Sequence, residues 1–173
     1  MQLLHNIFKN VISGELLASL PEGEVERCDV DINSRSMVLD VQFKAYVTAG
    51  IRARIGSEIK AALKLNKITL NITFKDTELT ADIFKDLTEE LRTKNPMVNG
   101  FLNDAVYNLN GNELTVELFG GGLKLIKDSG FEKQFAELCR NLFGIAISLK
   151  FTGKPESDEY IPPAPAPAPA PTF

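Results

Sequence analysis

Three aspartates occupy alternating positions on neighbouring predicted strands near the start of the chain. Asp29 and Asp31 are two residues apart, and Asp40 belongs to the next strand. Carboxylates gathered in this way can hold paired metal ions roughly 4 Å apart, as in nucleases and polymerases. Because Arg27 and Lys44 are close by, we interpret the aspartates as part of a solvated, charged face. We therefore predict no metal site and no catalytic residue.

A glycine triplet followed by lysines is the second candidate for chemistry. Backbone amides at a helix start can bind phosphate, and KH domains clamp a nucleic-acid backbone with a Gly-x-x-Gly loop. Three consecutive glycines at 120–122 do not have that spacing, which occurs nowhere else in the chain. We favour a simple strand-to-helix turn. The alternative is nucleic-acid contact through Gly121, Gly122, Lys124 and Lys127.

The densest basic segment lies on the helix predicted after Thr48 and at the strand that follows it. It contains five basic residues: Arg52, Arg54, Lys60, Lys64 and Lys67. No aromatic residues are interleaved with them to stack bases, as a single-strand platform requires. We interpret these residues as a solvated helix face, and the alternative is nucleic-acid contact through Lys60, Lys64 and Lys67.

Other reactive residues are few. The single histidine, His5, has no nearby partners for a catalytic triad or a metal site, so we expect it to be structural. The spacing of Cys28 and Cys139 suggests neither a metal site nor a redox pair. We expect two buried thiols in a reducing cytosol. The P-loop and Gly-x-Ser-x-Gly motifs are also absent, and we predict no cofactor and no small-molecule substrate.

Composition limits the classes of partner. The 173 residues are 44% hydrophobic and carry a net charge of −4, so the chain lacks the excess of Lys and Arg that tight, sequence-independent nucleic-acid binding needs. It shows neither a signal-peptide pattern nor the run of about 18 apolar residues that a membrane span needs. We expect a cytoplasmic protein without membrane contact.

The first half of the chain reads as helix, strand, strand, helix, strand. Apolar residues at helical spacing run from Leu3 to Leu17 and predict one or two short helices, which Pro21 ends. Residues 25–33 and 37–45 alternate as a hairpin with one wet face. Thr48 is the predicted cap of a helix whose stripe consists of Ile51, Ile55, Ile59 and Ala62. Residues 67–75 form the third strand.

The second half repeats this order behind two further helices. One helix follows Thr80 with the stripe Ile83, Leu87 and Leu91, and another is predicted to start at Asn95-Pro96. Asn110-Gly111 predicts a type I′ hairpin turn. Ser129 and Glu132 have the spacing of a capping box. The helix that they open has a stripe of four apolar residues, Phe131, Phe135, Leu138 and Leu142, and 145–151 is the closing strand.

These patterns predict an α+β fold built from two small strand-strand-helix-strand units. We place the first unit, with its N-terminal helix, at 1–76 and the second at 77–153. Residues 154–173 are rich in Pro and Ala. Alternating prolines cannot supply the donors of a helix or a central strand, so we expect this tail to be an extended or disordered linker.

Several of these residues also resemble a known family. Asn95-Pro96-Met97, Phe101-Leu102, the turn Leu109-Asn110-Gly111-Asn112 and the helix exit Phe143-Gly144 resemble the N-terminal region of PolC-type DNA polymerase III alpha subunits, the replicative polymerases of low-GC Gram-positive bacteria. The resemblance covers residues 15–151. It implies a two-part, non-catalytic region in which the second unit is KH-like with two extra helices. The polymerase and 3′–5′ exonuclease activities would belong to later domains of the parent chain.

The sequence thus favours a docking or positioning module of a bacterial replisome, which supports DNA replication through contacts with other replisome proteins. The first alternative is a KH-like nucleic-acid-binding module that contacts template or primer, with at most weak single-stranded DNA contact. The second is an adaptor whose proline tail is itself the ligand of an aromatic-lined groove; that tail lacks the flanking basic residue typical of such ligands.

Overall fold

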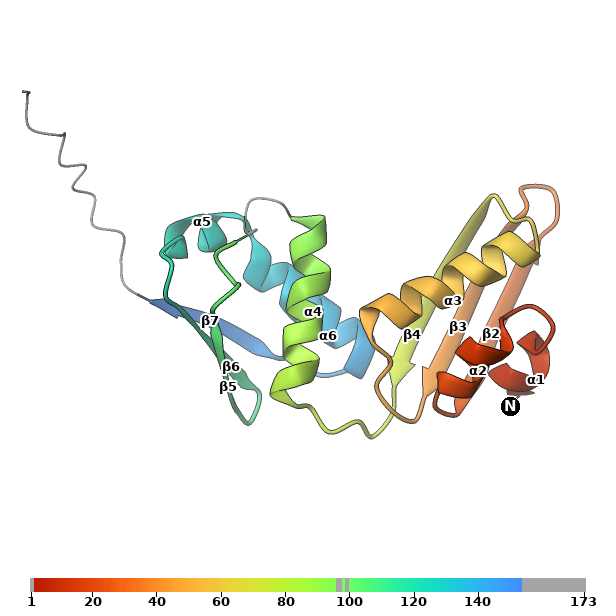
Figure 1. Cartoon of the computed structure of the whole chain (residues 1–173), viewed down its shortest axis with the longest axis horizontal. Coiled ribbons are helices and arrows are strands. Elements are labelled where there is room, and N and C mark those ends of the chain that lie inside the picture. Colours follow the sequence, from red (N-terminus) through yellow and green to blue (C-terminus); the bar gives the residue numbers. More distant parts are fainter. Residues whose placement is uncertain (1, 96–97, 99, 154–173) are drawn as a thin grey trace, which may run out of the picture.

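The fold is α+β, as predicted, with two small sheets. The structure, a computed structural model, describes residues 2–95, 98 and 100–153 of the chain. The described part is elongated, with one sheet toward each end and helices α4 (Ala81–Lys94) and α6 (Phe131–Phe143) between them (Figure 1).

The first sheet has the strand order β1-β2-β3-β4. Its strands are β1 (Gln2–Leu3), β2 (Gly23–Asp31), β3 (Ser36–Phe43) and β4 (Lys67–Phe74). The first three are antiparallel neighbours, whereas β4 runs parallel to β3 with unbroken register from Ser36↔Lys67 to Phe43↔Phe74. The two predicted faces of β3 are confirmed, because Met37, Leu39, Val41 and Phe43 are buried and the residues between them are not.

Three helices lie against this sheet: α1 (Leu4–Phe8), α2 (Gly14–Ser19) and α3 (Ala49–Ala62). The opening segment therefore forms two short helices, preceded by β1, which its helical spacing did not predict. In α3 the predicted stripe holds at Ile55 and Ile59, which are buried. It fails at Ala62, which is exposed because the helix ends there and leaves the sheet.

The second unit begins with α4 and contains a three-stranded sheet of order β5-β6-β7. Its other elements are β5 (Val106–Asn110), β6 (Glu113–Leu118), α5 (Leu123–Asp128), α6 and β7 (Ser148–Gly153). β5 and β6 are antiparallel, and β7 is parallel to β6, so this unit repeats the strand directions of the first. Thr80 caps α4 through its Oγ1, which accepts a hydrogen bond from the Ile83 N–H at 3.4 Å.

The predicted hairpin at Asn110-Gly111 is present, but its predicted turn type is wrong, and so is the capping box. Asn110 pairs with Glu113, so the central turn residues are Gly111 and Asn112, and only Gly111 has positive φ. A type I′ turn needs positive φ at both positions. The capping box fails because the Ser129 N–H already donates to Leu125 O as the end of α5, and Gly130 is the N-cap of α6.

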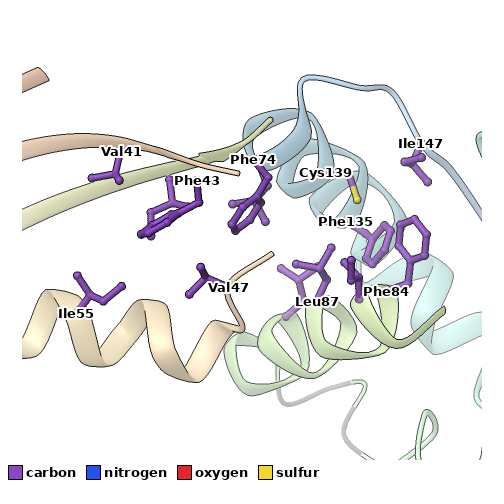
Figure 2. Packing of buried hydrophobic residues seen from close by; sticks show 14 of the residues in the cluster. Val41, Phe43, Val47, Ile55, Phe74, Phe84, Leu87, Phe135, Cys139 and Ile147 are labelled. Atoms are coloured by element: carbon purple, nitrogen blue, oxygen red, sulfur yellow. The ribbon is translucent and has the colours of Figure 1, made fainter. Parts of the chain in front are cut away.

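A single hydrophobic cluster joins the two units. Buried residues of the first sheet, such as Phe43 and Phe74, continue into Phe84, Phe135 and Cys139 of α4 and α6 (Figure 2). At the junction the rings of Tyr46 and Phe143 flank Phe74, with centroid distances of 5.0 and 5.4 Å. The predicted division between residues 76 and 77 falls between β4 and α4, and the core crosses it.

Two predicted segments lie outside the described residues. They are the helix start at Pro96 and the Pro/Ala-rich linker from residue 154. Residues 100–104, which follow the predicted helix start, form turns. Among the helices of the described residues, none combines the length and the apolar character that a membrane crossing requires.

Candidate functional site

A groove lies where the two units meet. Its volume is about 1150 Å³, and four elements line it: α3, β4, α4 and α6. Small-molecule sites usually enclose about 300–1,000 Å³, so this groove is larger than most of them. β4 is the strand of the first sheet that lies nearest to the second unit (Figure 1), and the groove runs along it.

The floor of the groove is the outer edge of β4. No described strand pairs with this edge. The N–H groups of Lys67 and Lys75 donate to Arg35 O and Phe43 O, so the odd-numbered residues of β4 face β3. Because hydrogen-bonding direction alternates along a strand, the N–H and C=O groups of Ile68, Leu70 and Ile72 point to the open edge. An edge of this kind is a template for another strand.

The wall formed by α3 consists mainly of small residues, with Arg52 and Lys60 beside them. Ala49, Gly50, Ala53, Gly56 and Ser57 line the groove. Apart from backbone of the helix itself, a methyl group built on Gly56 would meet only Leu70 Cδ2, at 3.9 Å, and one built on Gly50 would meet nothing within 4 Å. Space therefore remains between α3 and the edge of β4.

The opposite wall combines acidic residues of α4 with Leu138, Asn141 and Leu142 of α6, and ion pairs neutralise two of the acidic residues. Glu90 accepts from Arg52 at 2.6 Å and from Lys94 at 2.8 Å. The Arg52–Glu90 pair is largely buried, with 11% and 17% of the two side chains exposed. Glu89 forms an ion pair with Arg92 within the same helix. The acidic residues of α4 therefore add little net charge to the groove.

Asp86 of α4 joins the two walls at the end of the groove nearest to the N-terminus of α3. Its Oδ2 accepts hydrogen bonds from the Tyr46 hydroxyl at 2.6 Å and from the Ala49 N–H at 2.9 Å. Burial, and next the bond to Asp86, raise the pKa of Tyr46 well above its ordinary value. Since these contacts join α3 to α4, they hold the two walls at a fixed separation.

The first group of predicted site residues lies at the other end of the groove. Lys60 lines the groove from the last turn of α3. Lys64 lies just after the end of α3, and Lys67 is the first residue of β4. All three are exposed, and no ion pair joins them to other described residues. Arg52 and Arg54, by contrast, form ion pairs with acidic residues.

The second group lies far from the first. It consists of Gly121 and Gly122, which directly precede α5, and Lys124 and Lys127, which lie on α5. This helix is at the opposite end of the molecule from the C-terminus of α3 (Figure 1). The two groups therefore cannot bind one short ligand together. Gly122 has a packing role, because a Cβ atom there would lie 2.3 Å from Cδ1 of Phe101. Its φ of +78° also favours glycine.

The remaining candidates have structural partners. Asp29 pairs with Arg27, Asp40 accepts from Asn71 Nδ2 at 2.7 Å, and Asp31 is bonded within its own turn. The described residues contain no group of three or more His, Cys, Asp or Glu side chains that could hold a metal ion. His5 Nε2 donates to Leu17 O at 2.8 Å and so ties α1 to α2.

The expectation of two buried thiols is half wrong. Cys139 is fully buried in the core, whereas Cys28 is exposed on β2. Every residue of β2 from Glu26 to Asp31 is exposed, so neither face of this part of the strand is covered, and the prediction of one wet face is wrong here.

Sequence patterns did not point to the groove as a site. The alternation of apolar residues predicted its floor, β4, as a strand. It did not predict which edge of the sheet stays open, because that depends on strand order. The run of small residues on α3 was the available signal.

No protein-family model matches this chain, and no curated protein does.

Proposed function

We propose that this chain is a non-catalytic docking module that positions a PolC-like replicative DNA polymerase through contacts with other proteins of the replisome. The observation that carries the proposal is the groove, in which an open strand edge is paired with a wall of small residues. The resemblance of residues 15–151 to the N-terminal region of PolC supplies the replication context.

The charge distribution supports protein contact over nucleic-acid contact. The carboxylates of α4 in the groove are paired or hydrogen-bonded, so its walls neither attract nor strongly repel phosphate. The lysines predicted as candidates for nucleic-acid contact are exposed but divided between two distant places, the end of α3 with the start of β4, and α5. Tight non-specific binding depends on many uncompensated phosphate contacts along one surface.

Titration calorimetry of the chain with each purified replisome protein of a low-GC Gram-positive bacterium tests this function. At least one protein should bind with a micromolar or smaller Kd, with little dependence on salt. In parallel, incubation with primed template, nucleotides and Mg²⁺ should give neither extension nor degradation. The proposal fails if none of the proteins binds, or if an activity co-purifies with the chain.

The competing function is nucleic-acid binding by the lysines at the end of α3. Lys60, Lys64 and Lys67 favour it because they are exposed and without ion pairs in the described part of the chain. The salt dependence of single-stranded DNA binding separates the two functions, because phosphate contact releases counterions and contact with protein through the neutral groove does not.

A further inference from the structure

We infer that the groove binds its partner by β-strand addition: an extended segment of another protein pairs with the open edge of β4. This inference rests on the proposed docking function and specifies its surface. The partner segment is apolar at alternating positions and acidic at the end that lies beside Lys60.

Backbone geometry provides the first argument. Ile68, Leu70 and Ile72 direct their N–H and C=O groups to the open edge, and the groove runs along this edge from Ile68 to Thr73. Only an extended polypeptide supplies donors and acceptors at the matching repeat along the whole strand. Nucleic acid and folded helices do not.

The side chains of the groove provide the second argument. The side chains of Ile68 and Leu70 are half-buried and pack against the core, and half-buried Leu138 of α6 lies across the groove from them. An added strand points every second side chain to one face of the sheet. Those side chains would enter the space left by Ala53 and Gly56, so they must be apolar and of moderate size.

Charge provides the third argument and indicates which end of the groove binds the acidic residue of the partner. The acidic residues of α4 that line the groove are already paired or hydrogen-bonded, whereas Lys60 lines it without an ion pair to any described residue. Lys64 lies one turn further along the chain. An acidic residue at this end of the partner segment would therefore gain an ion pair.

Phage-displayed random peptides selected against the full chain test the inference. The enriched peptides should alternate apolar residues and carry an acidic residue at one end. Gly56→Leu fills the groove at a helical site where glycine is disfavoured, so the fold should tolerate it, and it should weaken binding by about tenfold or more. Ala62→Leu, on the exposed end of the same helix and outside the groove, should leave binding unchanged.

Hydrogen exchange of the chain with the most enriched synthetic peptide gives a readout specific to strand pairing. The amides of Ile68, Leu70 and Ile72 should become protected on binding. Those of Thr69, Asn71 and Thr73, already directed to β3, should change little. The inference is overturned if no peptide is enriched, if protection appears elsewhere, or if single-stranded DNA protects these amides instead.

The two proposals can fail separately. If a replisome protein binds the chain and Gly56→Leu does not weaken that binding, docking occurs on another surface and the strand-addition inference is wrong. If no replisome protein binds but the selected peptides protect the edge of β4, the proposed replisome function is wrong and the groove remains a peptide site.

Discussion

Among single residues, two glycines leave room for an aromatic ring of their own fold. Gly122 lies against the ring of Phe101, and Gly23 lies against the ring of Phe43, where a Cβ atom would be 2.6 Å from Cε1. Such close approaches let an aromatic ring pack directly on backbone. Gly121 and Gly122 both have positive φ at the turn into α5, and Gly122 also packs against Phe101.

Two alanine substitutions separate the cost of the backbone conformation from the cost of the contact with Phe101. Gly122 and Gly130 both have positive φ, but a methyl group on Gly130 would meet nothing within 4 Å. Gly130→Ala should cost about 1–2 kcal/mol of unfolding free energy, the usual cost of a left-handed residue. Gly122→Ala should cost more, because Phe101 must also move. Equal losses in urea denaturation would show that the Phe101 contact is unimportant.

Phe135 should be one of the main core residues of the second unit. It is fully buried and its ring packs on Phe84 at a centroid distance of 5.9 Å. We expect Phe135→Ala to lower the free energy of unfolding by about 3–5 kcal/mol. Phe119→Ala is the matched control, since 61% of Phe119 is exposed, and it should have little effect. A melting temperature for Phe135→Ala that matched the parent would contradict this packing.

The two cysteines should differ in reactivity. Burial raises the pKa of Cys139 to about 12, and the pKa of Cys28 is raised by partial desolvation and by the nearby Asp29. Because the thiolate is the reactive form, a thiol reagent near neutral pH should label Cys28 slowly and leave Cys139 unlabelled. The rate at Cys28 should rise with pH. Equal labelling of both cysteines in the folded chain would contradict the burial of Cys139.

At the scale of elements, the contacts between α3 and α4 determine the shape of the groove. Arg52 also donates from Nε to Val47 O at 3.1 Å, so its side chain links the segment before α3 to Glu90 of α4. Tyr46 and Asp86 make the second link. The walls should therefore keep their separation when the groove is empty.

A double-mutant cycle measures the first of these links. Combining Arg52→Met with Glu90→Gln should give a coupling energy of about 1–3 kcal/mol, because the pair is shielded from water. The control is the exposed pair Lys150–Glu113, which is also close, at 2.7 Å. Its coupling should be about 0–1 kcal/mol. If the two coupling energies are the same, the Arg52–Glu90 pair does not hold the walls together.

Most elements of this fold could be predicted because their residues alternate or repeat at helical spacing. This was true of β3, where every second residue is buried, and of α4, where Ile83, Leu87 and Leu91 face the core. β1 was missed because two residues paired through backbone carry no pattern. The capping box at Ser129 was wrong because the same motif can end one helix or begin the next.

The groove could not be predicted, for a physical reason of another kind. Periodicity shows which face of β4 is buried, but not which of its edges stays unpaired. That depends on the strand order β1-β2-β3-β4, with β4 at the edge, and on how α4 packs on α3. Arg52 illustrates the difficulty, since it was grouped with a solvated basic face and instead forms a largely buried ion pair.

At the scale of the whole molecule, the arrangement is a continuous core with a small sheet toward each end and an open groove between them. The candidate basic residues are divided between two distant ends, around α5 and at the end of α3. The net charge of the chain is −4. Because the basic residues are dispersed, they form no continuous surface that could bind a nucleic-acid backbone. The distribution is better suited to contact with another protein.

The measurement that tests this account most directly is the affinity for single-stranded DNA as a function of salt concentration. We predict a Kd no smaller than about 10⁻⁴ M at physiological salt, the weak end of non-specific binding. Lys64→Glu, at the end of α3, and Lys124→Glu, on α5, should each change it little. Micromolar binding at that salt, with a steep salt dependence that either substitution flattens, would contradict the account and favour a nucleic-acid-binding module.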